Sequence, residues 1–591
     1  MDDFIFGTLA SDAQRLAHVR ALGSGITHLN ARKPRDPLPG QPIQLELTLG
    51  PEHTSDRAWV YWSTDDDDPV GSGGAVSHGN ATPMELVDVK WDNLEWGYSK
   101  RYRATIPGQP DGTVLRYYLA AEDREGNESP ADDGAYYAFY VGDDPTPDWA
   151  YEAIIYHIFV DRFFPGEDEE WKHPESPSGF YGGTLRGITQ KLDYISGSGA
   201  NTLWLSPIFP SPSHHGYDAT DFFKVEPRLG SEADLRELVE AAHERHIKVM
   251  LDFVPNHWSS LHSTFQDALG DPNSPYVEWY KFRNWPEEYE SFFDVKNLPQ
   301  INLRHLEARQ HVLQAVEHWL NLGVDGFRLD YAIGPARDFW ADFRRTVLST
   351  NPDAWTFGEV VEPPDSQLSF QGLLDGCLDF ILLEAIRQTF AFRRWDAKRF
   401  MSFLDCHETY FPPSFTRPSF LDNHDMNRYL WVVNGDKRLL KIAALCQFTL
   451  AGPPVVYYGT EVGLSQLRDI RQDGKGILEE ARLPMLWGKE QDEDLITFYR
   501  KLIALRRRES ALIKGERRTL HADSDTLAYL RSDGSRSLVT VINLAPEPRQ
   551  VTLQGNRTTI AVETQDGCEL IKQADTVHVK LPAISGIVLV E

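Results

Sequence analysis

The chain has 591 residues, of which 41% are hydrophobic, 12% aromatic and 25% charged. This composition excludes an intrinsically disordered protein, and the length predicts two to four domains. The formal net charge of −29 argues against nucleic acid and anionic membrane surfaces as partners, because both bind basic patches, whereas a neutral substrate is compatible with it.

No window of the sequence approaches about 18 uninterrupted apolar residues, so no transmembrane helix is expected. The first residues, MDDFIFGTLASDAQRL, include early acids and no apolar run of signal length. A cytoplasmic location is therefore the default expectation, although a mature chain without its signal peptide would look the same. Cys377, Cys406, Cys446 and Cys568 lie far apart without a CxxC spacing, which is typical of reduced, mostly buried thiols.

Residues 1–145 contain short, partly alternating segments separated by Gly, Pro and Asp clusters. This pattern predicts an N-terminal β-sandwich of the immunoglobulin-like kind. Carbohydrate binding, completion of a dimer partner's active site and simple packing against the next domain are all open roles for it. The acidic run Asp65 to Asp68 is expected to form a solvated turn, and GDDPTPDW (142–149) is a candidate linker.

Residues 146–510 alternate short apolar strands with amphipathic helical segments. Eight such alternations predict a catalytic (β/α)8 barrel, that is, an α/β TIM barrel. The segment 258–307, between the third and fourth strands, is too long for an ordinary loop and predicts a small excursion, domain B, over the barrel mouth. The expected strands are 154–163, 201–209, 248–257, 325–331, 355–360, 377–383, 418–425 and 454–461.

A helix is expected near 492–509, and residues 511–591 return to the alternating pattern of strands in segments such as TLAYLRS and SLVTVINL. This region predicts a C-terminal antiparallel β-sandwich.

Polar side chains that have no place in a strand core gather at the carboxyl ends of the predicted barrel strands. In a (β/α)8 barrel the active site lies at this end. A single Asp there is more often a helix cap, but several carboxylates with an Arg and two His would be costly to bury unpaired. The residues are Asp252, Asn256, His257, Arg328, Asp330, Glu359, His424 and Asp425.

Three carboxylates without a Cys/His cluster indicate the acid–base and nucleophile chemistry of glycoside hydrolysis. Arg328 lies two residues before Asp330, on the same face of its strand, and is expected to keep Asp330 ionised. Glu359 ends an apolar strand, where desolvation would raise its pKa and suit it to the acid role.

Four segments resemble, in order and spacing, the signature motifs of the alpha-amylase family, glycoside hydrolase family 13. They are DFVPNH (252–257), GFRLDYA (326–332), GEV (358–360) and FLDNHD (420–425). The N-terminal sandwich and LPQIN (298–302) resemble most closely the group of neopullulanases, cyclomaltodextrinases and maltogenic amylases. GYDATDF (216–222) and GPPVVYYGTEVG (452–463) fit the family as well.

The resemblance implies a retaining mechanism and assigns roles to the carboxylates. Asp330 matches the nucleophile, Glu359 the general acid/base and Asp425 the third carboxylate, which binds sugar hydroxyls.

The resemblance also implies substrate-binding residues. Tyr217 would stack under the sugar, and the other matching residues are Asp218, His257, Arg328, His424 and Arg428. Asn256 stands where many members place a calcium or structural asparagine, so calcium is an optional cofactor and none is required.

The sequence departs from the group at Tyr331 to Pro335 and at Val360-Val361, which leaves the acceptor-side subsites and the exact specificity open. The expected function is a hydrolase of α-1,4-glucosidic bonds in starch, maltooligosaccharides or cyclodextrins, with transglycosylation in addition, acting as a monomer or homodimer. The alternatives are a glucanotransferase and a hydrolase of another α-glucoside, such as pullulan, trehalose or an α-1,6 branch. A non-catalytic glucan-binding protein is the least favoured hypothesis, because all three carboxylates are intact.

Overall fold

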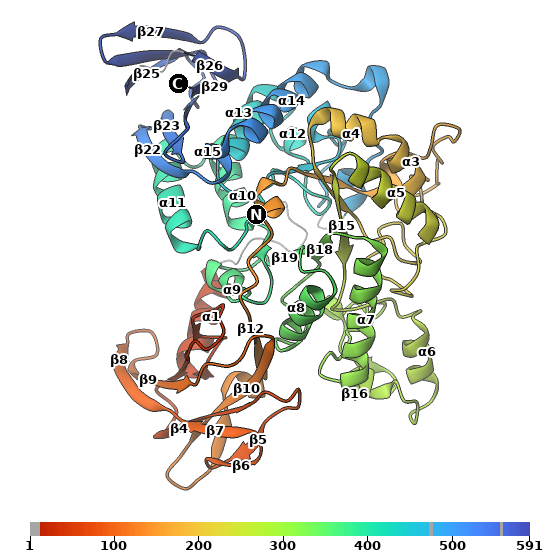
Figure 1. Ribbon diagram of the computed structural model, residues 1–591, viewed down its shortest axis with the longest axis vertical. Helices are drawn as coiled ribbons and strands as arrows, with labels where there is room; N and C mark the ends of the chain where they lie inside the picture. The colour runs from red at the N-terminus through yellow and green to blue at the C-terminus, as the bar shows by residue number, and fades with distance from the viewer. Residues whose placement is uncertain (1–11, 472–476, 556–558, 591) are drawn as a thin grey trace.

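The computed structural model describes residues 12–471, 477–555 and 559–590 (Figure 1). The N-terminal domain consists of helix α1 (Asp12–Ser24) and two antiparallel sheets around a core of its own. In β3, buried side chains alternate with more exposed ones, as expected for a strand with one face in a core. One sheet has the order β1 (Ile26–Thr27), β3 (Ile43–Leu49), β9 (Gly97–Ile106), β8 (Glu85–Asp92), with β2 (Arg32–Lys33) beside β3. The other has the order β11 (Glu128–Pro130), β10 (Thr113–Glu122), β4 (Arg57–Ser63), β7 (Asn80–Pro83), with β12 (Tyr137–Val141) beside β10.

A parallel sheet of seven strands forms the wall of the barrel. The order is β20 (Gly376–Cys377), β19 (Trp355–Gly358), β18 (Gly326–Leu329), β15 (Lys248–Phe253), β14 (Thr202–Leu205), β13 (Ile155–Ile158) and β21 (Val455–Tyr457). The segment predicted as the seventh strand in chain order, 418–425, is not a regular strand. Isolated bridges from Thr416 to Gly376 and from Ser419 to Pro454 close the ring instead. Pro418 between them has no N–H to donate, which prevents a continuous ladder there.

The prediction of a strand at 377–383 was also largely wrong, because helix α10 (Phe380–Ile386) begins where the strand was expected to continue. The Asp379 side chain accepts a hydrogen bond from the Leu382 N–H at 2.9 Å and caps this helix. A short apolar run such as FILL fits a buried strand and a buried helix equally well, so the periodicity alone could not separate them.

The predicted helices surround the sheet. In α5, a capping box of Ser231 and Asp234 fixes the first turn, and an apolar stripe faces the barrel. The longer helices of this layer are α5 (Glu232–Glu244), α7 (Leu306–Leu322), α8 (Phe339–Thr350), α11 (Ala397–Tyr410), α13 (Lys437–Thr449) and α14 (Glu493–Arg508). Of the helices that the structure describes, none is long and apolar enough to cross a membrane.

The excursion after β15 forms a small lobe with helix α6 (Ser263–Gly270) and the short strands β16 (Phe282–Asn284) and β17 (Glu288–Tyr289). Figure 1 shows it beside α7 at the edge of the barrel.

The C-terminal domain also has two antiparallel sheets, as predicted. Their orders are β22 (Glu516–Ala522), β23 (Thr526–Ser532), β24 (Ser537–Asn543), β29 (Ser585–Val590), β26 (Thr559–Glu563), and β25 (Arg549–Gln554), β28 (Thr576–Leu581), β27 (Glu569–Gln573). The four cysteines are free thiols; Cys377 and Cys446 are buried and Cys406 is exposed.

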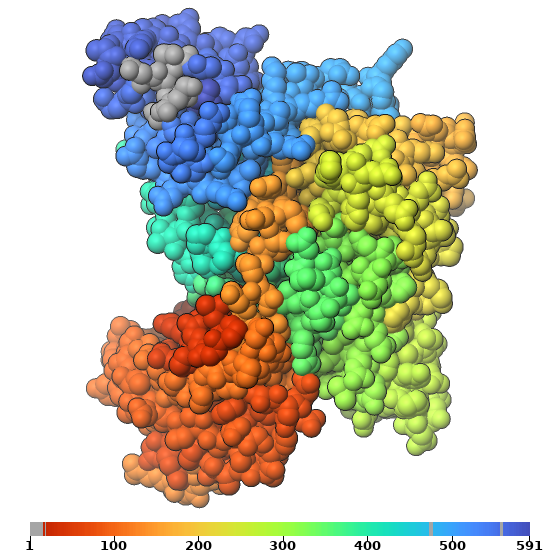
Figure 2. All heavy atoms as spheres, in the orientation of Figure 1, coloured from red at the N-terminus to blue at the C-terminus, as the bar shows by residue number. Residues whose placement is uncertain are grey.

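The N-terminal domain forms a lobe beside the barrel, and β12 and β10 lie along α8 (Figures 1 and 2). The acidic run at 65–68 is largely exposed, as expected of a solvated turn, but two of its residues also form ion pairs with the barrel. Asp66 pairs with Arg345 at 2.6 Å, and Asp68 pairs with Arg304 at 2.5 Å. The acidic run is part of the contact between the two domains.

Candidate active site

Strand β18 directs alternate side chains to opposite faces, as the sequence predicts. Phe327 and Leu329 lie in the hydrophobic core between sheet and helices. Arg328 is fully buried, at 0% exposed, and lies beside Asp252 of β15, its partner in the strand register. The polar face of β18 therefore points into the barrel.

The Arg328 guanidinium joins three carboxylates. Its Nη1 donates to Asp252 Oδ1 at 2.7 Å and to Asp330 Oδ1 at 2.9 Å. Its Nη2 lies 2.7 Å from Glu359 Oε1 as an ion pair. Although burial acts against its charge, Asp252 and Glu359 raise the pKa of Arg328 well above the ordinary value. The arginine stays charged, and the proposed nucleophile and acid/base are neighbours across it.

The pKa values of these carboxyl groups differ from those in water. Burial raises the pKa of Glu359 to about 7, in the direction expected from its place at the end of an apolar strand. Burial also raises the pKa of Asp330 to about 7, although Arg328 acts to lower it. The expectation that Arg328 keeps Asp330 ionised is right about the direction in which Arg328 shifts the pKa of Asp330. Burial and the charges of Asp252 and Asp425 outweigh this effect.

Asp425 behaves in the opposite way. Burial acts to raise its pKa, but His424 and Arg482 lower it well below the ordinary value, so Asp425 stays ionised. Arg482 Nη2 donates to Asp425 Oδ1 at 2.9 Å, and Arg482 Nε donates to the His424 carbonyl at 2.9 Å. His424 Nε2 lies 3.1 Å from Asp425 Oδ2.

Sequence reasoning missed Arg482 as a site residue. It lies in the one-turn segment 478–482, well after the last predicted strand, and its neighbours show no pattern that indicates an active site. Asp252 was noticed as a polar anomaly but was not assigned a role. The pairing of β15 with β18 places Asp252 opposite Arg328, and this register indicates that Asp252 belongs to the site.

Tyr217 connects the loop after β14 to the carboxylates. Its hydroxyl lies 2.9 Å from Asp252 Oδ2 and 2.7 Å from His424 Nε2. The rings of Tyr217 and His424 are stacked, with centroids 5.2 Å apart and an interplanar angle of 10°. Burial lowers the pKa of His424, which favours the neutral imidazole. Both residues lie where the sequence predicts sugar contacts.

His257 follows β15 and hydrogen-bonds to the backbone of Tyr217. Its ring stacks on Phe292 with centroids 4.4 Å apart, and burial lowers its pKa to about 3. Asn256 Nδ2 lies 3.2 Å from His257 Nδ1, and Asn256 Oδ1 accepts a hydrogen bond from Gln300 Nε2 at 2.9 Å.

The surroundings of Asn256 do not fit calcium. Its amide oxygen is engaged by Gln300, whereas Ca²⁺ needs six to eight oxygen ligands with carboxylates among them. In residues 12–471, 477–555 and 559–590, no group of three or more His, Cys, Asp or Glu could hold a metal ion.

Two of the expected binding residues have protein partners outside the carboxylate cluster. Asp218 accepts hydrogen bonds from the hydroxyls of Ser211, at 2.5 Å, and Ser213. Arg428 is fully buried, donates to the Tyr458 carbonyl at 2.9 Å and lies over the Tyr457 ring. These contacts indicate that both residues shape loops at the mouth, and sugar contact by either stays a prediction.

Tyr331, the first residue of the divergent stretch, has a left-handed backbone with a φ of 42°. Its N–H donates to Glu359 Oε2 at 3.2 Å. Its ring contacts Phe292 and Phe293, at centroid distances of 4.8 and 5.4 Å. The segment whose specificity the sequence leaves open therefore forms an aromatic rim next to Glu359.

The family model for the alpha-amylase catalytic domain matches residues 157–494, which include the whole carboxylate cluster. This chain belongs to the alpha-amylase family. It is therefore a glycoside hydrolase, and the resemblance drawn from the sequence motifs is confirmed.

Relatives in the family agree with the group indicated by the sequence. Alpha-amylase 2 of Dictyoglomus thermophilum is 39% identical over 471 residues, 79% of this chain and 81% of that protein. Neopullulanase 2 of Thermoactinomyces vulgaris is 33% identical over 431 residues, 69% of this chain and 72% of that protein. A solved structure of a cyclomaltodextrinase has a TM-score of 0.70 at 26% identity and covers 96% of this chain and 99% of its own.

An Asp330→Asn variant tests the electrostatic coupling of the two buried carboxyl groups. The charge of Asp330 is one cause of the raised pKa of Glu359, so its removal should lower that pKa from about 7 toward the ordinary value. A pH titration of ¹³C-labelled glutamate by NMR measures the shift. Asp193→Asn, which changes an exposed side chain, is the control and should leave the titration unchanged. An unchanged or higher pKa of Glu359 in Asp330→Asn would contradict the coupling.

Removal of divalent ions tests the assignment of Asn256 as a structural residue. Dialysis against EDTA should change neither the Tm nor kcat/KM, because the Asn256 amide is already engaged by Gln300 and His257. Differential scanning calorimetry and initial rates measure both. A Tm that falls in EDTA and returns with calcium, but not with magnesium, would refute this.

Proposed function

We propose that this family member is a retaining α-glucan hydrolase that cleaves α-1,4-glucosidic bonds by double displacement. The observation that carries the proposal is the placement of Asp330 and Glu359 on two nitrogens of one buried guanidinium, that of Arg328. Retaining enzymes need two carboxyl groups close together, one ionised and one protonated. With raised pKa values on both residues, the pair holds about one proton near neutral pH.

In the proposed first step, ionised Asp330 attacks C1 of the sugar while Glu359 donates its proton to the departing glycosidic oxygen. In this step the shared proton is assigned to Glu359 and the charge to Asp330, whose carboxylate accepts a hydrogen bond from Arg328 at 2.9 Å. A covalent β-glucosyl ester on Asp330 results. In the second step, ionised Glu359 removes a proton from a water molecule while the water oxygen attacks C1. The ester bond between C1 and Asp330 breaks, so Asp330 is ionised again and Glu359 is protonated again.

The other polar residues are proposed to bind the sugar at this position. Asp425, ionised by His424 and Arg482, would accept hydrogen bonds from two hydroxyls. Tyr217 would offer its ring and His257 its imidazole. The mechanism has no step that needs a metal ion.

The proposed substrates are starch, maltooligosaccharides and cyclodextrins. Two relatives, one named neopullulanase and one named cyclomaltodextrinase, support an α-glucan. Transglycosylation is part of the proposal, because the aromatic rim of Phe292, Phe293 and Tyr331 beside Glu359 offers stacking surfaces to a sugar acceptor. The same rim favours the second candidate, a glucanotransferase. A hydrolase of pullulan, trehalose or an α-1,6 branch is the remaining alternative.

The proposal includes a cytoplasmic enzyme that is a monomer or a homodimer and binds no nucleic acid. Sedimentation analysis distinguishes the two oligomeric states.

Azide rescue tests the roles of the two carboxylates. Asp330→Ala should lose hydrolysis but convert α-maltosyl fluoride and azide to the β-maltosyl azide, because a single displacement inverts C1. Glu359→Ala should be slowed by roughly 10²- to 10⁴-fold on maltooligosaccharides and should form the α-azide, because azide then attacks the covalent intermediate. NMR of the products assigns the anomers. Glu237→Ala, an exposed carboxylate on α5, should behave as the wild type. The reverse pair of anomers, or no azide product from either variant, would refute the assignment.

A substrate panel tests the specificity. Starch, β-cyclodextrin and maltotriose should be hydrolysed faster than pullulan and trehalose, with products identified by chromatography. At high maltoheptaose concentration, products longer than the substrate should appear beside the hydrolysis products. If longer chains dominate at every substrate concentration, the glucanotransferase is the correct function. If pullulan or trehalose is the preferred substrate, the α-1,4 specificity is wrong.

A further inference from the structure

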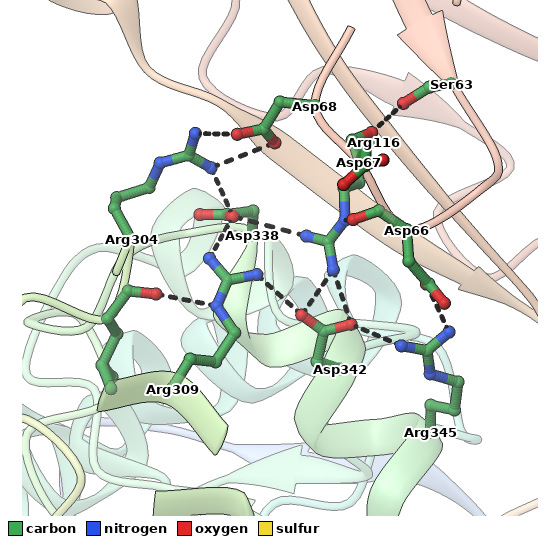
Figure 3. A network of polar contacts seen from close by, with 11 residues as sticks. Ser63, Asp66, Asp67, Asp68, Arg116, Arg304, Arg309, Asp338, Asp342 and Arg345 are labelled. Carbon is green, nitrogen blue, oxygen red and sulfur yellow. Dashed lines mark hydrogen bonds and ion pairs between the residues drawn. The ribbon is translucent and has the colours of Figure 1, made fainter. Parts of the chain in front are cut away.

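A network of ion pairs with a buried centre and more exposed ends joins the N-terminal domain to helix α8 (Figure 3). The N-terminal domain contributes Arg116 of β10 and the acidic residues after β4. The barrel contributes three arginines and two aspartates, of which Asp338 is the N-cap of α8 and Asp342 lies in its first turn. The residues in the network are Asp66, Asp68, Arg116, Arg304, Arg309, Asp338, Asp342 and Arg345.

Arg116 is the centre of the contact across the domain boundary. Its Nη2 donates to both carboxylate oxygens of Asp342, at 2.7 and 2.6 Å, and its Nη1 lies 3.5 Å from Asp338 Oδ2. Its Nε donates to the Asp66 carbonyl at 3.0 Å. The side chains of Arg116, Asp338 and Asp342 are all buried. Although burial acts to raise it, Arg116 and Arg309 lower the pKa of Asp342.

A buried ion pair is weak evidence for net stability, but the hydrogen bonds from Arg116 to both oxygens of Asp342 restrict the position of that carboxylate. The pair of Arg116 and Asp342 therefore fixes the position of the first turn of α8 relative to the N-terminal domain.

The first turn of α8 is connected to the acid/base through one side chain and one short backbone segment. Trp340, between Asp338 and Asp342, donates from Nε1 to the Ala332 carbonyl at 3.1 Å. The Ala332 N–H donates to the Glu359 carbonyl at 3.0 Å. The preceding N–H, of Tyr331, donates to Glu359 Oε2 at 3.2 Å. The end of this path is the carboxyl group that must transfer the proton.

This backbone segment needs support. A φ of 42° at Tyr331 is a costly conformation for an aromatic residue and persists only where its surroundings impose it. The hydrogen bond from Trp340 holds the carbonyl of the next residue and so is one of the contacts that impose it.

We propose that Arg116 of the N-terminal domain is a positioning residue for Glu359. It holds α8 so that Trp340 keeps the 331–332 backbone in place, and this backbone orients the Glu359 carboxyl group. The inference rests on the proposed acid/base role of Glu359. The N-terminal domain thus supports proton transfer in the barrel of its own chain without contacting the substrate.

Comparison of two substrates in an Arg116→Met variant tests the proposal. The first displacement needs proton donation with maltotriose, whereas α-maltosyl fluoride has a leaving group that departs without it. We expect kcat/KM for maltotriose to fall roughly 10- to 100-fold, as for a misplaced catalytic group, and kcat/KM for the fluoride to change less than about 2-fold. The pH limb of kcat/KM that reports the acid should shift as well. Arg124→Met, at a side chain 82% exposed in the same domain, is the matched control and should have no effect.

Two further variants test individual contacts between Arg116 and Glu359. Arg116→Lys keeps one charged nitrogen for Asp342 but cannot also reach the Asp66 carbonyl and Asp338, so it should give an intermediate loss. Trp340→Phe removes the donor to Ala332 together with part of a buried ring, and should reproduce the substrate dependence of Arg116→Met even if that variant fails to fold. Equal losses on both substrates with an unchanged pH profile in Trp340→Phe, or no loss at all, would overturn the inference. The acid/base role itself is tested separately, since Glu359→Ala must show the same leaving-group dependence if that role is correct.

Discussion

The active site depends on one fully buried guanidinium. Burying the charge of Arg328 in the barrel would be costly without anions beside it. Burying the charges of its three partners, Asp252, Asp330 and Glu359, would be costly without Arg328. The three carboxylates come from adjacent strands, β15, β18 and β19, or from the residues that directly follow them. The three strands can therefore pair side by side at this end only if these charges compensate one another. The same contact that makes the strand ends compatible with burial brings the reacting groups together.

Burial then separates the carboxylates into two classes. Asp425 has His424 and Arg482 as close partners and is held ionised, whereas Asp330 and Glu359 share Arg328 with Asp252 and have raised pKa values. A group with its own cation keeps its charge, and groups that share one compete for it. This distribution suits a reaction that moves one proton and needs a permanent negative charge beside it.

Much of the fold and of this site could be predicted from the sequence, because strand alternation and polar anomalies are local properties. The placement of Arg328 and Asp330 on one face follows directly from a period of two. Pairing between distant segments is not local. Nothing near Arg482 indicates that it reaches Asp425, and nothing near Asp66 or Asp68 indicates arginines in another domain. The strand expected at 377–383 failed because a short apolar run does not specify its period.

The two outer domains are attached to the barrel by different means. The C-terminal domain shares the barrel's hydrophobic core, to which it contributes Leu527, Tyr529 and Ile542. The N-terminal domain has a core of its own and meets α8 through ion pairs together with a few apolar side chains. Ion pairs exposed at the edge of an interface are screened by salt, whereas buried pairs are screened much less. The N-terminal lobe is thus attached through charge, and only the outer pairs of that contact, Asp66 with Arg345 and Asp68 with Arg304, lie where rising ionic strength can screen them.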